Sequence, residues 1–367
     1  MSGRVPRFGW VAVSQAASSA SNLVTVLAAA AAGDSPMVDA VTLLGAVYLV
    51  TLCLGRGLLG DPLLLADEPD AGEADTVVGL AGVIGLVAGS ALTLVVAPLL
   101  GAEAMPATTI GLVLCPLLMQ DALRYVAFRR NRADLAAWSD LGWTVVAAVL
   151  AAGLLTTRQL TTERLFLSWC LGGAAAGAWL AWALKIVPRL SGPWRVLRSN
   201  LDLRLSLLAD GLLTVGAVQA ALVLTAVVAG RSAAGQVRFL QALFGPATIL
   251  FMALYISSVS PGRHQDPRGA ASSMFVKLGL TTLGFACAFW ALPAAFGRAI
   301  SGGTFVEAQA LLWPFTLSQL LAGLGTAGMT GLRLAGRTAD AARIRGVWAV
   351  CSPARGLAVQ PGACLAC

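Results

Sequence analysis

Long runs of apolar residues alternate with short polar connections along almost the whole sequence. A helix needs roughly 20 apolar residues to cross the hydrocarbon core of a bilayer, and run after run in this chain reaches that length. The pattern therefore predicts an all-α polytopic membrane protein. The ten expected spans cover residues 8–32, 38–59, 76–100, 105–127, 135–155, 164–187, 205–229, 236–260, 274–296 and 304–331.

The composition supports this fold class, since 57% of the residues are hydrophobic and 12% are charged, against about 25% charged in an average soluble domain. So little polar surface could not cover a water-soluble protein. The first apolar run, which follows Arg4 and Arg7, could instead be a cleaved signal peptide. Residues 14–22 are too polar for the apolar part of such a peptide, which favours a true span with one polar face.

The basic residues, which give a net charge of +7, indicate the direction of the spans. With a cytoplasmic N-terminus, most of them fall in cytoplasmic connections or at the adjacent helix ends, as the positive-inside rule requires. The acidic connection around residues 60–75 falls on the same side, but acidic residues contribute little to orientation, and we interpret it as a solvated loop. The basic residues form no single patch with interleaved aromatics, so the lipid bilayer, and no nucleic acid, is the expected partner.

The longest basic connection divides the chain after six spans, and the two sides share local patterns. The segment Ala32–Ser35 matches Ala229–Ser232 at an offset of 197 positions, and Pro116 matches Pro314 at nearly the same offset. A repeat of six helices would be a transporter architecture, but no run long enough to cross follows Arg345, so we expect the tail to replace two spans. The predicted domains are a six-helix bundle at 1–187, a basic cytoplasmic linker at 188–204, a four-span bundle at 205–343 and a non-spanning tail at 344–367.

Two Gly-x-x-x-Gly pairs lie within spans, at 85–89 and 173–177. This spacing lets helix backbones approach closely. In a chain with 40 glycines the spacing says little about a dimer, and we expect it to serve packing within the chain.

Residue combinations typical of enzymes are missing from the sequence. The single histidine, His264, lies in a polar loop, and neither a metal-binding spacing, a nucleophile elbow nor a phosphate-binding lysine motif is present. The sequence therefore predicts a protein that is not an enzyme and that holds no metal or cofactor.

Charged and amide side chains within the spans are the candidate functional residues, because an unpaired charge at the centre of a membrane helix costs about 2.5–3.5 kcal/mol. Gln120, Asp121 and Arg124 lie three and four positions apart and so share one helix face. Singly, such charges could reach the headgroups or pair at helix ends; together they indicate a hydrated vestibule open to the cytoplasm. The deeper amides could line a cavity or join helices. The further candidates are Arg56, Asp140, Asp210, Gln15, Asn22 and Gln219.

Three segments resemble the bacterial polysaccharide flippases of the multidrug/oligosaccharidyl-lipid/polysaccharide exporter superfamily. They are residues 116–143 (PLLMQDALRYVAFRRNRADLAAWSDLGW), 54–62 (LGRGLLGDP) and 241–246 (QALFGP). The resemblance implies two six-helix bundles around a V-shaped central cavity, in the bacterial cytoplasmic membrane. It also implies movement of polyprenyl-pyrophosphate-linked oligosaccharide between leaflets by alternating access, with polysaccharide assembly proteins as further partners. The chain departs from the family in lacking the last two spans.

On this resemblance Arg56 and Arg124 would contact the diphosphate, because the arginine fork donates two hydrogen bonds at once. Asp121 and Asp140 would orient these arginines or couple transport to an ion gradient. The remaining assignments are Gln120, Gln15, Asn22 and Gln219 as substrate contacts and Asp210 as a further coupling residue.

Three other functions remain open. A drug antiporter of the same superfamily would have acidic cavity walls, whereas this chain mixes arginine with aspartate. A polysaccharide polymerase or ligase would carry its catalytic residues in a large outer loop, and the outer connections here are short. A non-transporting scaffold of a polysaccharide synthesis complex is the third.

Overall fold

The structure is a computed structural model that describes residues 6–31, 35–65, 72–100, 107–228, 244–259, 266–291 and 311–347, with single positions near 236–241 and at 309. All regular structure within these ranges is helical. Several features of interest in the sequence lie outside them, namely Arg238, His264, residues 66–71 of the acidic connection and residues 348–367 of the tail.

Each of the ten predicted spans overlaps a helix. The first six correspond to α1 (Pro6–Ala31), α2 (Ser35–Gly55) with its continuation, α4 (Glu73–Leu100), α5 (Ala107–Arg129), α6 (Ala133–Thr156) and α7 (Thr162–Leu184). The others correspond to α9 (Leu201–Gly211), which continues through the π-helix η2 (Leu212–Gly216) into α10 (Ala217–Val228), then to α12 (Gly245–Val259), α13 (Pro267–Ala291) and α16 (Leu312–Leu334). Among the described residues, seven helices are long and apolar enough to cross a membrane.

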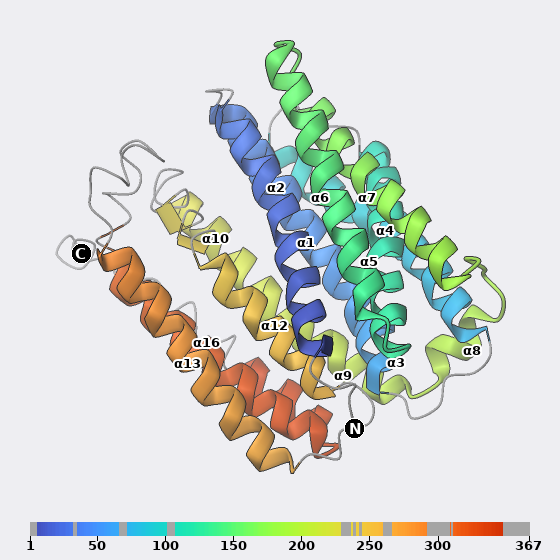
Figure 1. The fold of residues 1–367 in the computed structure, drawn as a ribbon, viewed down its shortest axis with the longest axis vertical. Coiled ribbons are helices and arrows are strands. Elements are labelled where there is room, and N and C mark those ends of the chain that lie inside the picture. The colour runs from blue at the N-terminus through green and yellow to red at the C-terminus, as the bar shows by residue number, and fades with distance from the viewer. Residues whose placement is uncertain are drawn as a thin grey trace. The chain divides into compact units, whose positions relative to one another are not determined.

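The chain forms two compact units that divide near Leu212. In the first unit α4 packs along α5, α1 along α6, and α7 against both α5 and α6 (Figure 1). The basic linker and α9 belong to this unit. In the second unit α13 packs along α16, and Phe244 packs with Phe289 and Phe315.

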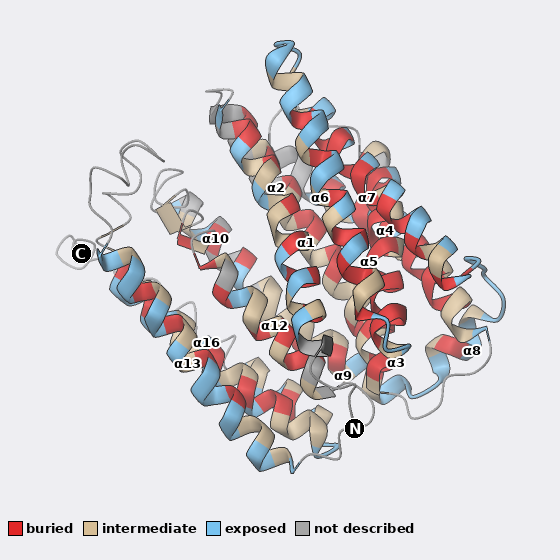
Figure 2. Cartoon of the chain, in the orientation of Figure 1, coloured by how far each residue is buried: buried red, intermediate tan, exposed pale blue. Residues whose placement is uncertain are grey.

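Burial in the first unit follows the pattern expected of a membrane protein. The buried side chains include Leu117, Phe128 and Trp143, whereas apolar side chains such as Leu94 and Val149 are exposed. Buried and exposed positions alternate along the helices of this unit (Figure 2). Outward apolar faces suit a lipid solvent, in which helix association depends on close packing rather than on the hydrophobic effect.

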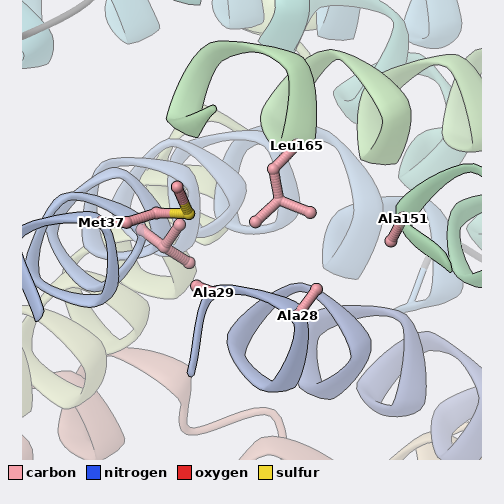
Figure 3. Close-up of a cluster of buried hydrophobic side chains, with 6 residues drawn as sticks. Ala28, Ala29, Met37, Ala151 and Leu165 are labelled. Carbon is pink, nitrogen blue, oxygen red and sulfur yellow. The ribbon is translucent and has the colours of Figure 1, made fainter. Parts of the chain in front are cut away.

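One apolar cluster shows how alternating helix directions bring distant residues together. Ala28 and Ala151 lie near the ends of α1 and α6, while Met37 and Leu165 lie near the starts of α2 and α7. These four helix ends meet, and their side chains form a buried cluster at one end of the unit (Figure 3).

The glycine pairs act within the chain. A Cβ atom at Gly85 would lie 2.7 Å from the Leu114 carbonyl oxygen, and one at Gly89 would lie 2.6 Å from the Leu114 side chain. On α7, a Cβ atom at Gly177 would lie 3.1 Å from the Cβ atom of Gln120. The expected intramolecular packing is confirmed, and Gly177 brings α7 against Gln120, a candidate site residue of α5.

Candidate functional site

A π-helical turn places Arg56 beside α5. Helix α2 passes into η1 (Arg56–Gly60), and α3 (Asp61–Leu65) continues from it. Two glycines of η1 allow neighbours to approach closely. A Cβ atom at Gly57 would lie 2.5 Å from the Leu208 Cα atom, and one at Gly60 would lie 2.9 Å from the Tyr125 ring. Such π-helical insertions occur frequently at functional sites.

Arg56 forms a two-point ion pair with Asp121. Its Nε atom donates to Oδ2 at 3.0 Å, and its Nη2 atom donates to Oδ1 at 2.7 Å. The guanidinium also lies over the Tyr125 ring, 5.9 Å from its centroid. The Arg56 side chain keeps 21% of its surface exposed, whereas Asp121 keeps 6%.

Arg124 connects the two carboxylates. Its Nη1 atom donates to Asp121 Oδ1 at 3.0 Å, and its Nε atom lies 2.9 Å from Asp140 Oδ2, close enough for an ion pair but not aligned as a hydrogen bond. Its Nη2 atom donates to the Ser14 hydroxyl at 3.1 Å. The side chain is 2% exposed, so the alternative that Arg124 extends to the headgroups is wrong.

Asp140 is the buried end of the network, with a fully buried side chain. The Ser14 hydroxyl donates to its Oδ2 atom, and Gln120 Nε2 donates to its Oδ1 atom at 2.8 Å. Gln120 Oε1 is buried without a hydrogen-bond partner among the described residues. The Ser139 hydroxyl donates to the Ala176 carbonyl and thereby ties α6 to α7 at this level.

We call this set the arginine–aspartate network; it comprises Ser14, Arg56, Gln120, Asp121, Arg124 and Asp140. Its two arginines and two aspartates balance in charge. Burying an ion costs several kcal/mol unless a partner and further hydrogen bonds compensate, and here every charged group has an oppositely charged neighbour. The network is therefore a closed, neutral arrangement in which Arg56 is the most exposed of the four charged side chains, at 21%.

The other predicted site residues lie elsewhere. Gln15 is buried and Asn22 half-buried on α1, the helix of Ser14, but neither takes part in the hydrogen bonds described above. Asp210 is buried on α9 in the first unit, and Gln219 is buried on α10 in the second. Their roles stay predictions.

Ser14 is a network member that the sequence did not indicate, although it lies in the same polar run, 14–22, as the candidates Gln15 and Asn22.

No family model matches the sequence, and no curated protein matches it. Solved structures do match. One, described as MATE in complex with MaD3S, is 14% identical, with a TM-score of 0.65 over 92% of this chain and 84% of the other. An outward-facing multidrug resistance MATE family transporter of the MOP superfamily is 12% identical, with a TM-score of 0.55 over 96% and 97% of the two chains.

A third match is a MOP superfamily transporter from Pyrococcus furiosus, described as having a binding pocket of reversed polarity. It is 13% identical, with a TM-score of 0.52 over 95% of each chain. At such identities the likeness establishes the fold. The predicted fold class is confirmed: the chain is an all-α polytopic membrane protein with the fold of MATE transporters of the MOP superfamily.

Proposed function

We propose that this chain is a transporter that moves a polyprenyl-pyrophosphate-linked oligosaccharide from the cytoplasmic to the outer leaflet by alternating access. Its membrane would be the bacterial cytoplasmic membrane, with the N-terminus in the cytoplasm. The fold supports the transporter class. One observation supports a negatively charged substrate, namely that the most exposed charged side chain of the arginine–aspartate network is an arginine.

The network presents different groups at its two ends. Arg56 has a partly exposed side chain, while the Asp140 side chain at the other end is completely buried. A charged group that approaches the network from the exposed side therefore meets a cation first. This arrangement favours an anionic substrate, and it favours Arg56 over the buried Arg124 as the contact.

Asp121 would also keep an ion pair if Arg56 bound a different partner. If a phosphate oxygen replaced Asp121 on Arg56, Asp121 would keep its ion pair with Arg124 at 3.0 Å. No carboxylate would then be left buried without a partner, which is the expensive outcome for such networks. Loss of Arg124 would have the opposite effect, because Asp140 has Arg124 as its ion-pair partner.

The geometry of arginine suits a diphosphate in particular. The fork that now holds both oxygens of Asp121 could hold two phosphate oxygens in the same way. A lysine would supply the charge but not the two-point contact. The two-point contact of Arg56 would therefore favour a diphosphate headgroup over other anions.

An antiporter of cationic drugs is less well supported. Such a protein needs acidic groups within reach of its substrate, and both carboxylates here are buried and paired with arginine. The fold itself leaves either polarity open, since one solved structure of this fold is described as having reversed pocket polarity.

Transport by the purified full chain in proteoliposomes tests the proposal. A fluorescent polyprenyl diphosphate is placed in both leaflets, and its movement is followed by chemical quenching of the outer leaflet; a lipophilic fluorescent cation serves as the competing substrate. We expect movement of the diphosphate, lost in Arg56→Gln and reduced in Arg56→Lys. Arg158→Gln, which changes an exposed charge in the turn after α6, is the matched control. Transport of the cation without the diphosphate would refute the proposal.

A further inference from the structure

The connection between α7 and α9 folds back along the start of α4. The Arg189 backbone N–H donates to the Asp75 carbonyl oxygen at 3.1 Å, and the Thr76 hydroxyl donates to the Ser191 carbonyl oxygen at 3.1 Å. A Cβ atom at Gly79 would overlap the Arg189 carbonyl group. The connection is therefore fixed against α4 rather than suspended in solvent.

The contacts lie near the beginning of α4, and this fixes where the connection lies along that helix. Helix α4 is one of the helices able to cross a membrane, and its span begins at Glu73. Gly79 lies six residues further, or about 9 Å along the helix axis at 1.5 Å per residue. The connection therefore lies at the first end of a helix able to span a membrane, which is the end at which a membrane interface would lie.

The outward side of the connection combines apolar and basic side chains. Trp194 is 70% exposed on α8 (Pro193–Arg198), and Leu190 is 57% exposed just before it. On the opposite side of α8, Val196 is buried. Helix α8 lies at the same end of the unit as α3 and α9 (Figure 1). Exposed tryptophan beside arginine is typical of segments at a membrane surface.

Three arginines of this surface are available to a partner. Arg189, Arg195 and Arg198 are all exposed, and within the described part of the chain none of their guanidinium groups has an ion-pair partner. Arg204, by contrast, is buried and binds Glu73 at 3.6 Å and the carbonyl oxygens of Leu58 and Ser199. Arg204 therefore anchors the connection, while the other three arginines present their charge outward.

We infer that Leu190, Trp194 and the exposed arginines 189, 195 and 198 form a binding surface for anionic phospholipid headgroups of the adjacent leaflet. The tryptophan and leucine enter the interface, and the guanidinium groups bind lipid phosphates. A phosphatidylglycerol headgroup fits this chemistry because it carries a net negative charge, whereas the phosphate of phosphatidylcholine is neutralised within its own headgroup. The inference does not depend on the identity of the transported substrate.

Native mass spectrometry of the detergent-purified full chain, titrated with phosphatidylglycerol or phosphatidylcholine, tests the inference. We expect tighter binding of phosphatidylglycerol. The triple variant Arg189→Gln/Arg195→Gln/Arg198→Gln should raise its dissociation constant at least about tenfold, since each basic residue near a charged membrane surface contributes roughly a fivefold factor. The corresponding triple lysine variant keeps the charge and should keep most of the affinity.

A matched control removes the same number of charges elsewhere, at Arg132, Arg158 and Arg337. All three are exposed, and Arg132 and Arg337 already pair with Asp134 and Asp340. The control should bind phosphatidylglycerol as the unmodified chain does. Three results would overturn the inference. The chain could bind both lipids equally, or the glutamine triple variant and the control variant could bind phosphatidylglycerol with equal affinity. The third result is displacement of the lipid by an equal concentration of inorganic phosphate. If the triple variant does not fold, Arg198→Gln alone should still weaken binding about fivefold.

Discussion

Replacing Arg124 with methionine should destabilise the first unit more than any other single change in the network. Arg124 lies between both carboxylates, at 3.0 Å from Asp121 and 2.9 Å from Asp140. Methionine fills much of the volume but leaves the Asp140 charge buried, with only the Ser14 hydroxyl and the Gln120 amide to compensate. Removing one partner of a buried ion pair costs about 3–5 kcal/mol, and burial on both sides of this pair means that solvent screening does not reduce the effect.

A second substitution tests whether the loss of stability in Arg124→Met comes from the unpaired charge of Asp140. Asp140→Asn removes the buried charge and keeps a side chain that can bond to Ser14 and Gln120. In the Arg124→Met background, Asp140→Asn should therefore recover about half of the lost stability or more, a coupling of roughly 2 kcal/mol, within the range seen for residues of one network.

The assay is reversible unfolding of the purified chain in mixed micelles, followed by tryptophan fluorescence, for both single variants and the double variant. Asp134→Asn is the control. It breaks the exposed pair with Arg132, in which both side chains are well exposed, and it should change stability by less than about 1 kcal/mol. The reasoning fails if Arg124→Met costs no more than this control, or if the double variant is no more stable than Arg124→Met.

Three further substitutions test single contacts, the first two in the same unfolding assay and the third by proteolysis. Ser14→Ala removes the hydroxyl that joins Arg124 to Asp140 and should cost about 1–3 kcal/mol; an unchanged midpoint would show that the hydroxyl is dispensable. Gly57→Ala places a Cβ atom 2.5 Å from the Leu208 backbone and should cost about 1–3 kcal/mol by overpacking, while Gly142→Ala, which meets no neighbour within 4 Å, should be neutral or slightly stabilising. Arg204→Met leaves the Leu58 and Ser199 carbonyls and Glu73 without their donor and should destabilise the attachment of the connection to α4, measured as faster proteolysis between α7 and α9; equal cleavage rates would contradict the anchoring role.

The fold class could be predicted from the sequence because the lipid solvent imposes a simple rule. Each span must be long, apolar and helical, so run length alone located a helix for each of the ten predicted spans. The glycine pairs likewise carry a local signal, since small residues four positions apart permit close packing. The π-helical turn η1 was not predicted, because the residues that pack on its glycines, Leu208 and Tyr125, lie far away in the sequence.

All members of the candidate site except Ser14 could be predicted from the sequence, but the geometry of the site could not. The cost of a charge in a membrane helix marked Arg56, Asp121, Arg124 and Asp140 individually. The sequence does not show which of them are partners, because those pairs join residues 65 and 16 positions apart as well as near neighbours. The expected hydrated vestibule is, in the structure, a largely buried network with Arg56 at its exposed end.

The most direct test of the central claim is the affinity of the purified chain for a soluble short-chain polyprenyl diphosphate, compared with Arg56→Gln. The measurement should use the glutamine triple variant at positions 189, 195 and 198 as background, so that lipid binding at the connection does not contribute. We expect saturable binding of the diphosphate that weakens about tenfold or more in Arg56→Gln, because charge-assisted hydrogen bonds are lost. Equal affinity with and without the Arg56 guanidinium would contradict it, as would saturable binding of a lipophilic cation in place of the diphosphate.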